Sequence, residues 1–362
     1  MKFIKNKYIF VVILLCSILF VSFGFTNIYV SQNQPTEEDD FVVVTSFYPM
    51  YIATMNVIGD TEGVTLKNLS EPQTGCLHDF QLTPADMKLL STADAFIING
   101  GGIESFMEDI AKQYPDLVVI EACEGIELLC ETEAHGHEQG EDLHDYEKEH
   151  VEEHDTETHD YESEEEHSHE SDIEHDHETE QNQMVDSHAD HNHDVNAHAW
   201  MSVENYRKQV ENIASGLAKT APEFAESFLA NAGIYDGKLE ELQVEQENLL
   251  TLTQGEEVIM FHCAYDYVAE DLGLEVAFCM DLDEERQVSA GEVAEVLEVI
   301  ENHEVKYIFA EALYGTDMCE MVQKEAKVKV IYLDPLNRGV YEADSYLEGM
   351  RNNLKLIRDV FR

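Results

Sequence analysis

The sequence predicts an α/β protein of two lobes, each with a parallel sheet flanked by helices, joined by one long linker helix. Short runs of β-branched residues alternate with helical patterns in residues 41–120 and again in residues 254–362. Such alternation is typical of a parallel, doubly wound sheet. A single long pattern with mostly helical spacing of apolar residues separates the two series, at residues 222–253.

The first 40 residues read as a segment for export. Lys2, Lys5 and Lys7 precede an apolar run at residues 8–25. Residues 1–30 are therefore predicted to be a signal peptide or N-terminal membrane anchor, and 31–40 a polar tether. Leu15 precedes Cys16, where lipidation favours a small residue, so lipidation is not favoured. The body of the protein is expected outside the cytoplasm, secreted or anchored on the outer face of the membrane.

The charge of the chain limits its partners. The formal net charge is −55, which argues against nucleic acid and against an anionic membrane surface. About half of the excess negative charge lies in residues 131–194. About 270 residues remain after the leader and this segment, enough for two lobes of ordinary size. The composition suits a protein that handles cations.

The first lobe is expected over residues 41–221. Thr83, Pro84 and Asp86 provide an N-cap, a first-turn proline and an acid at N3 for the second of its helices. The glycines at 100–102 permit a tight turn, but no phosphate-binding fingerprint accompanies them. The expected strands are 41–46, 63–69, 95–99 and 117–120, and the expected helices are 50–58, 83–93, 104–113 and 202–219.

Residues 131–194 form a histidine- and acid-rich insert in this lobe. Thirteen of the 17 histidines lie there, without apolar periodicity, so we predict disorder. Pairs of the form His-x-His at 135/137, 167/169, 175/177 and 191/193 offer weak cation sites. A solvated acidic linker that binds metal only incidentally is the alternative interpretation.

The linker helix and the second lobe follow. The linker, residues 222–253, opens at Pro222 and is expected to be long enough to join two lobes. Residues 254–362 form the second lobe, in which Ser289 and Glu292 predict a capping box. Its expected strands are 258–261, 274–278, 305–310 and 328–333, and its expected helices are 289–302 and 341–361.

Four side chains form a candidate metal site. His78 and His198 lie in loops of the first lobe, and His262 and Asp334 each follow an apolar strand of the second. Ligands bind outside the carboxyl ends of parallel strands, so we expect the metal in the cleft between the lobes. Three imidazoles and a carboxylate suit four-coordinate Zn²⁺. Taken singly, each residue is more often an ordinary loop residue, and only the combination favours a metal.

Other candidates receive structural interpretations. His303 lies at a predicted helix end, where a cation complements the helix dipole. Glu311 follows a strand and is expected to support a ligand or to act as a structural acid. Six cysteines lie beyond the leader, and we interpret them as packing residues or disulfide partners rather than metal ligands. They are Cys76, Cys123, Cys130, Cys263, Cys279 and Cys319.

The chain resembles the zinc/manganese solute-binding proteins of bacterial ABC importers. The motifs are VTSFYP at 44–49, HDFQLTP at 78–84, NGGGIE at 99–104, NAHAW at 196–200, FHCAY at 261–265, LDPL at 333–336 and the segment 346–354. The resemblance implies that His78, His198, His262 and Asp334 surround the metal. It also implies Zn²⁺ rather than Mn²⁺, because zinc-binding members have histidine at the third position. Asn196-Ala197 departs from the usual Asp-Pro.

The resemblance implies a binding protein that is not an enzyme. It would capture Zn²⁺ and deliver it to a membrane permease driven by an ATPase, and we expect it to be a monomer. A zinc-dependent hydrolase is the alternative from another class, with Glu311 as its base. A catalytic site needs an open water position, however, and four protein ligands would close it. A third alternative is a metal-buffering or adhesion protein in which the insert does the main work.

Overall fold

The computed structural model describes residues 40–74, 80–130, 195–280, 282 and 288–362. The predicted leader, the insert and His78 lie outside these ranges. Both sheets belong to one compact unit. Within the described residues, no helix combines the length and the apolar character needed to cross a membrane.

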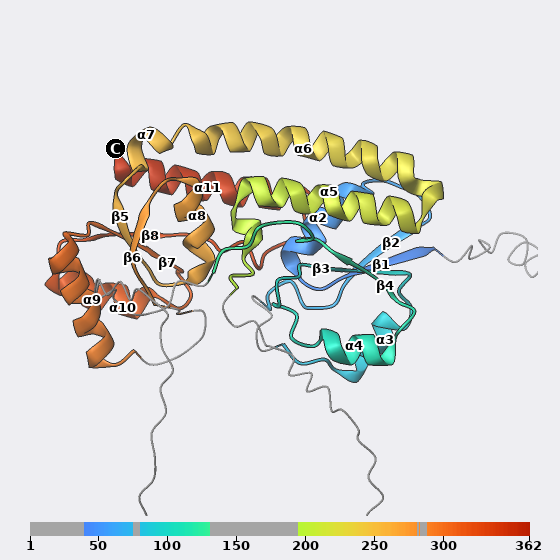
Figure 1. Cartoon of the computed structure of the whole chain (residues 1–362), viewed down its shortest axis with the longest axis horizontal. Coiled ribbons are helices and arrows are strands. Elements are labelled where there is room, and N and C mark those ends of the chain that lie inside the picture. Colours follow the sequence, from blue (N-terminus) through green and yellow to red (C-terminus); the bar gives the residue numbers. More distant parts are fainter. Residues whose placement is uncertain (1–39, 75–79, 131–194, 281, 283–287) are drawn as a thin grey trace, which may run out of the picture. The chain divides into compact units, whose positions relative to one another are not determined.

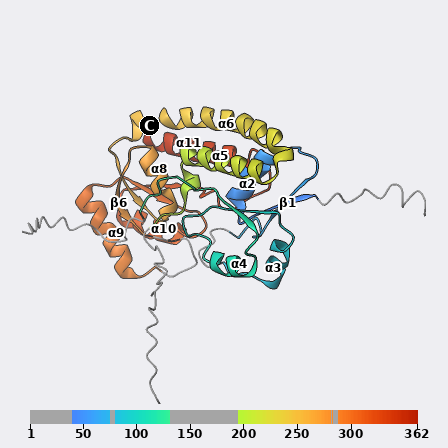
Figure 2. The ribbon, with the colours of Figure 1, turned by 45° about the vertical axis from the view of Figure 1, so that its right-hand side comes forward.

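The first half of the chain builds a four-stranded parallel sheet with the strand order β2-β1-β3-β4. Helices α2 and α5 pack against this sheet. Figures 1 and 2 show α3 and α4 on the opposite side from α2 and α5. The elements are β1 (Phe41–Thr45), α2 (Tyr48–Ile58), β2 (Val64–Asn68), α3 (Pro84–Leu90), β3 (Ala95–Ile98), α4 (Met107–Gln113), β4 (Val118–Glu121), the 3-10 turn η1 (Ala199–Met201) and α5 (Val203–Thr220).

The second half repeats the same plan, with the parallel order β6-β5-β7-β8. Alternate residues of β5 enter different core clusters, because successive side chains of a strand point to opposite faces. Val258 and Met260 pack with α8 and α11, and Ile259 packs with α9 and α10. The elements are β5 (Glu257–Met260), η3 (Cys263–Tyr265), α8 (Asp266–Asp271), β6 (Glu275–Cys279), α9 (Ala290–His303), β7 (Tyr307–Ala310), α10 (Thr316–Glu325), β8 (Lys329–Tyr332) and α11 (Ser345–Phe361).

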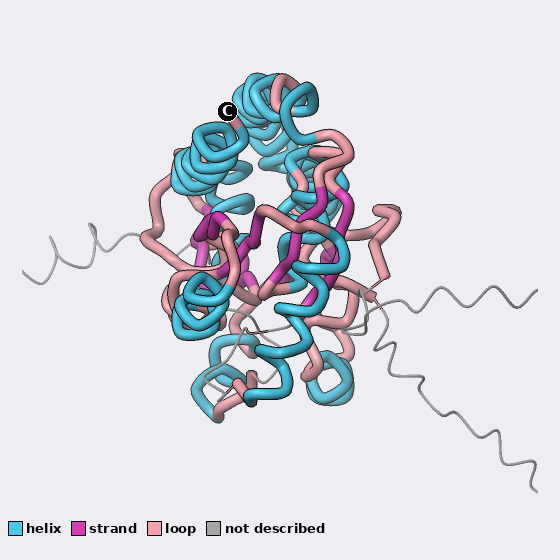
Figure 3. The backbone as a smooth tube through the Cα atoms, turned by 90° about the vertical axis from the view of Figure 1, so that its left-hand side faces the viewer, coloured by secondary structure: helices cyan, strands magenta, loops and turns pink. Residues whose placement is uncertain are grey.

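Three helical pieces fill the predicted linker: η2 (Pro222–Phe224), α6 (Ala225–Glu247) and the short α7 (Leu250–Thr253). Helix α6 packs against α2 and α5 from the first half and against α11 from the second. One hydrophobic cluster runs through both halves, from Val43 of β1 to Ile357 of α11. Figure 3 shows helices on both sides of the strands. The predicted fold class, two parallel sheets flanked by helices, is confirmed.

Several details differ from the sequence prediction. Two helices were not expected, α8 and α10. The terminal helix begins at Ser345 instead of residue 341, because the Tyr341 ring packs against Tyr51, with ring centroids 4.0 Å apart, and its hydroxyl accepts a hydrogen bond from Asn68. The described cysteines form no disulfide with one another, and Cys123, Cys263, Cys279 and Cys319 are buried. Their interpretation as packing residues is therefore favoured over disulfide pairing.

Candidate metal centre

His198 lies just before η1, in the loop that leads into α5, and is buried. Its backbone N–H lies 3.1 Å from Asn196 Oδ1, and its ring Nδ1 lies 2.9 Å from the same oxygen. The ring also contacts Trp200, with ring centroids 5.0 Å apart. Trp200 is itself held by a hydrogen bond from its Nε1 to the Pro335 carbonyl in the second half. The His198 ring is thus held from the Nδ1 side.

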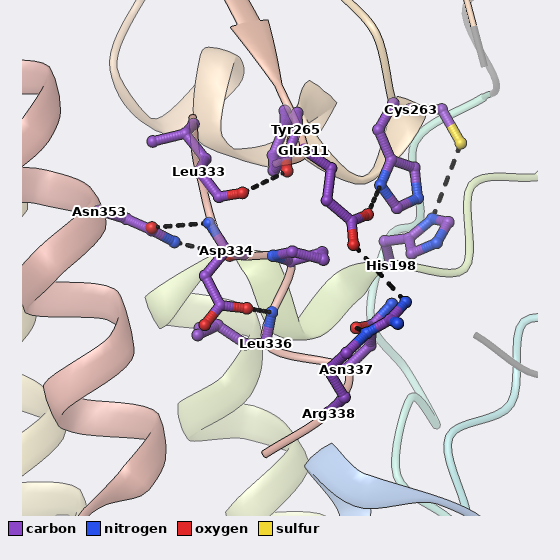
Figure 4. Close-up of polar contacts among 12 residues, drawn as sticks. His198, Cys263, Tyr265, Glu311, Leu333, Asp334, Leu336, Asn337, Arg338 and Asn353 are labelled. Atoms are coloured by element: carbon purple, nitrogen blue, oxygen red, sulfur yellow. Dashed lines mark hydrogen bonds and ion pairs between the residues drawn. The ribbon is translucent and has the colours of Figure 1, made fainter. Parts of the chain in front are cut away.

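His262 follows β5 in an extended conformation and is fully buried. Its Nδ1 lies 3.3 Å from Oε2 of Glu311, which follows β7. Glu311 Oε1 lies 3.5 Å from a guanidinium nitrogen of Arg338, so the carboxylate sits between an imidazole and a cation (Figure 4). A carboxylate next to one ring nitrogen of a histidine favours a hydrogen on that nitrogen and leaves the other nitrogen for a metal. These contacts agree with the interpretation of Glu311 as a supporting acid.

The two histidines come from different halves of the chain and meet. Their ring centroids are 5.2 Å apart and their ring planes are nearly perpendicular, at 85°. Around them, three tyrosine or tryptophan donors reach backbone carbonyls: Trp200 to Pro335, Tyr265 to Leu333 at 2.7 Å, and Tyr346 to Trp200 at 2.9 Å. Buried aromatic side chains with satisfied polar tips give the loops a defined position. The fold therefore brings together His198 and His262.

Asp334 follows β8, as predicted, but its carboxylate faces its own turn. Oδ1 accepts a hydrogen bond of 2.8 Å from the Leu336 N–H, and Figure 4 shows the carboxylate directed toward Leu336 rather than toward His198. The Asp334 backbone is clamped by Asn353 of α11, which accepts from its N–H and donates to its carbonyl. The pKa of Asp334 is raised above its ordinary value, mainly by partial burial and also by the negative charge of Glu311. The hydrogen bond from the Leu336 N–H acts in the opposite direction.

The turn after Asp334 is strained. Leu336 has a φ of +56°, a left-handed conformation that a leucine rarely adopts. Its side chain packs closely against Gly349 of α11: a Cβ there would lie 2.4 Å from Leu336 Cδ2. Strain of this kind persists where the surroundings enforce it and often marks functional turns. This turn holds Asp334 beside a hollow of about 220 Å³ that is also lined by Tyr48 and Arg338.

Of the four predicted ligands, His198 and His262 are adjacent, Asp334 lies in a neighbouring turn, and His78 lies outside the described residues. Within the described ranges, no three His, Cys, Asp or Glu side chains form a group that could hold a metal ion. The predicted ligand set therefore stays a prediction.

The sequence does not predict a role at the site for two polar residues of this region. The sequence marks Asn196 only as a departure from a motif, although it contacts His198 directly. Arg338 belongs to no motif, although it pairs with Glu311 and its guanidinium lies 5.5 Å from the centre of the Tyr314 ring. Neither has a sequence signal by itself, because both act through partners that are distant in the chain.

Comparison with known families gives one match over most of the chain. The family described as ZnuA, "Zinc-uptake complex component A periplasmic", matches residues 43–360. Two curated relatives are the zinc-binding protein AdcA of Streptococcus pyogenes, 28% identical over 357 residues, and the manganese-binding lipoprotein MntA of Halalkalibacterium halodurans, 21% identical over 332 residues. The AdcA alignment covers 96% of this chain but 61% of AdcA, and the MntA alignment covers 90% of both.

Solved structures show the same fold. The binding protein FpvC of Pseudomonas aeruginosa with Ni²⁺ has a TM-score of 0.64 at 23% identity, covering 89% of this chain and 96% of that one. Zn(II)-bound AdcA of Streptococcus pneumoniae has a TM-score of 0.63 at 22% identity, covering 88% of this chain and 57% of that one. The chain thus spans about three-fifths of the length of the AdcA proteins that it matches.

Proposed function

Because the chain belongs to the ZnuA family of zinc-uptake complex components, we propose that it captures Zn²⁺ outside the cytoplasm and delivers it to an ABC-type import permease. The permease would be driven by a cytoplasmic ATPase, and the protein would act as a monomer, secreted or anchored on the outer face of the membrane. Members of this family are components of uptake complexes rather than enzymes. Zinc is the cargo, taken up and released unchanged.

The observation that carries this proposal is the meeting of two buried histidines from opposite halves of the chain. Their rings lie 5.2 Å apart, and each has its Nδ1 next to an oxygen, from Asn196 or Glu311. Imidazoles held in this way present Nε2 to a metal, and imidazole is a good ligand for Zn²⁺. A site between two lobes also allows lobe movement to open it for release.

We propose His78, His198, His262 and Asp334 as the ligands, in a cleft between an N-terminal lobe and a C-terminal lobe. His78 lies in the motif HDFQLTP, and Asp334 lies in a strained turn directly beyond β8. Glu311 is already engaged by His262 and Arg338, so it supports a ligand rather than serving as one. The same contacts argue against Glu311 as the base of a hydrolase.

The test replaces one histidine and counts tight zinc equivalents by competition with a chromophoric chelator. His198→Ala should remove the tight equivalent, because the site loses one of the two imidazoles that the described residues bring together. His303→Ala is the matched control: its ring pairs with Glu257 at 3.4 Å and is half exposed, away from the site. Unchanged tight stoichiometry in His198→Ala would exclude this residue from the site.

Metal preference gives a second test of the same site. Nitrogen ligands favour zinc over manganese in the Irving–Williams order. His262→Glu should shift the preference toward Mn²⁺, because a hard oxygen replaces a borderline nitrogen. The ratio of the two dissociation constants, measured by calorimetry for both proteins, reports the shift. If the unaltered protein bound Mn²⁺ as tightly as Zn²⁺, the assignment of His262 as a zinc marker would fail.

A further inference from the structure

We propose that Asn196 is a positioning residue that fixes the tautomer of His198 and couples this histidine to the turn that carries His262. The inference rests on the proposed function, since it concerns how two zinc ligands are held. It assigns a role to a side chain that is not itself a ligand.

Asn196 uses both ends of its side-chain amide. It is fully buried. Its Oδ1 lies 3.1 Å from the backbone N and 2.9 Å from the ring Nδ1 of His198. Its Nδ2 donates to the carbonyl of Cys263 at 2.8 Å and to Oδ2 of Asp266 at 3.0 Å. The amide therefore has four polar contacts, two through each end.

These contacts fix which end of the amide faces the histidine. Only an NH₂ group can donate to both a carbonyl and a carboxylate, so Nδ2 must face Cys263 and Asp266. The reverse orientation would place an amide oxygen against two oxygen acceptors and an NH₂ group against a backbone N–H. Oδ1 is consequently the atom that faces the His198 ring.

The orientation of the amide then fixes the tautomer of the ring. An amide oxygen accepts hydrogen bonds and cannot donate, so the ring nitrogen at 2.9 Å must carry the hydrogen. In a neutral imidazole with a hydrogen on Nδ1, the lone pair is on Nε2. Asn196 thus prepares His198 to bind a metal through Nε2 and holds the ring in one rotation.

The other end of the amide reaches the second ligand. Cys263 directly follows His262 and begins η3, and Asp266 begins α8. Cys263 Sγ also lies 3.9 Å from His198 Nδ1, as Figure 4 shows. One buried side chain therefore joins the loop that carries His198 to the turn that carries His262, so that a displacement of either segment strains the same four contacts.

The primary test observes the tautomer in the full-length, metal-free protein. Long-range ¹H–¹⁵N spectra at about pH 8.5, where an ordinary imidazole is neutral, distinguish a protonated Nδ1 from a protonated Nε2. The His198 signals are identified by their loss in His198→Ala. The unaltered protein should show a protonated Nδ1, and Asn196→Ala should increase the Nε2-protonated form. An unchanged tautomer in Asn196→Ala would overturn the proposal, whatever the cargo of the protein.

Zinc affinity and a paired exchange complete the test. Asn196→Ala should weaken zinc binding by about 10- to 100-fold, the usual range for the loss of a partner behind a metal ligand. Asn196→Asp should also weaken it, because two carboxylates would then face each other. The double variant Asn196→Asp/Asp266→Asn restores the donor–acceptor pair with residue 266, although not the bond to the Cys263 carbonyl, and should recover part of the affinity and of the Nδ1-protonated signal.

Asn212→Ala serves as the structural control. Asn212 lies in α5 and donates to the carbonyls of Ala122 and Glu124, so its loss disturbs the same half of the chain without touching either histidine. It should leave the tautomer and the zinc affinity unchanged. A double exchange no better than Asn196→Asp alone, or an Asn212→Ala variant with the same loss, would show that Asn196 is only a structural residue. Failure of the unaltered protein to bind zinc would refute the proposed function but leave the tautomer result intact.

Discussion

The two sheets share their strand order, and both place a buried acid beyond their third strand. In the first half, Glu104 accepts hydrogen bonds from Ser46 Oγ at 2.8 Å, from the Asn99 N–H at 2.7 Å and from the Gly100 N–H at 3.0 Å. In the second half, Glu311 contacts His262 and Arg338. In both halves, the acid meets a residue that follows the first strand, Ser46 after β1 or His262 after β5.

The difference between the two acids lies in what they hold. Glu104 is saturated by a hydroxyl and by the backbone of its own turn, so it closes the loop after β3. Glu311 holds two side chains, and one of them, His262, has a second ring nitrogen that is suited to a metal. The same topology therefore yields a stabilising acid in one half and an acid that positions a ligand in the other.

The largest expected effect is on folding stability. Glu104→Ala leaves three buried donors without their acceptor, so the free energy of unfolding of the metal-free protein should fall by about 3 kcal/mol. Glu311→Ala should cost less, because it frees side chains that can rearrange. Urea denaturation measures both, with the exposed Glu62→Ala as a control expected within about 0.5 kcal/mol of the unaltered protein. If Glu104→Ala and Glu311→Ala lost the same free energy of unfolding, the assignment of a stabilising role to Glu104 and a positioning role to Glu311 would be contradicted.

A pH dependence should belong to Glu104. Burial raises its pKa from the ordinary 4.5 to about 7, against the lowering effect of its hydrogen bonds. Between these values the folded state retains a proton that the unfolded state has lost, so stability falls as pH rises from about 4.5 to 7. Glutamine at position 104 cannot titrate, so the free energy of unfolding of Glu104→Gln should fall by about 2 kcal/mol less over this pH range than that of the unaltered protein.

Urea denaturation midpoints of the unaltered protein and of Glu104→Gln, measured at pH 5 and pH 7.5, show how much stability each loses as the pH rises. Other raised acids, such as Asp271, whose burial raises its pKa to about 6, contribute equally to both proteins. Parallel pH profiles would show that Glu104 does not carry the effect.

The next effect concerns the metal. Glu311→Ala removes the oxygen beside His262 Nδ1 and should weaken zinc binding by about 10-fold or more. Glu311→Gln retains an acceptor and should lose less. Chelator competition measures the zinc affinity of both variants. We expect the affinity to be lowest in Glu311→Ala, intermediate in Glu311→Gln and highest in the unaltered protein. If both variants bound zinc normally, Glu311 would have no role in positioning His262.

The smallest expected effect comes from the neighbouring cation. Arg338→Gln removes a positive charge 3.5 Å from Glu311 and should strengthen zinc binding by about threefold at low salt, with a smaller gain at high salt. Arg351→Gln is the matched control, since Arg351 pairs with Glu245 at 3.0 Å on an exposed surface. Weaker binding in Arg338→Gln would show that Arg338 serves mainly to hold Glu311.

The sequence was most informative where local chemistry decides the structure. Thr83 is the N-cap of α3, as predicted, and it also forms a capping box with Asp86; Ser289 and Glu292 form the capping box predicted at α9. Ser202, the first residue of the expected helix 202–219, caps α5 by accepting from the Asn205 N–H. Caps of this kind involve residues only a few positions apart, so their signals are complete within the sequence.

Contacts between distant residues explain what the sequence could not show. Helix α10 begins after Gly315 without a side-chain cap, and α8 is only six residues long, so neither carries a strong start signal. The strand end before Asp334 was predictable, but the direction of its carboxylate depends on the left-handed turn at Leu336. The role of Asn196 depends on Cys263 and Asp266, about 70 residues further along the chain.

The two chain segments that flank residues 131–194 are paired with each other, and this pairing affects which insertions the protein can accept. Cys130 and Val195 form an antiparallel bridge, and the Asn196 N–H donates to the Leu129 carbonyl at 2.8 Å. Tyr267 of the second half clamps the same point, because its hydroxyl donates to the Asn196 carbonyl and accepts from the Leu129 N–H. Residues 129–130 and 195–196, which flank the segment 131–194, are thus held side by side. The entropic cost of closing a loop grows only slowly with loop length. The paired residues at 130 and 195 are therefore an insertion site at which segments of very different length and composition can be exchanged without changing the rest of the fold.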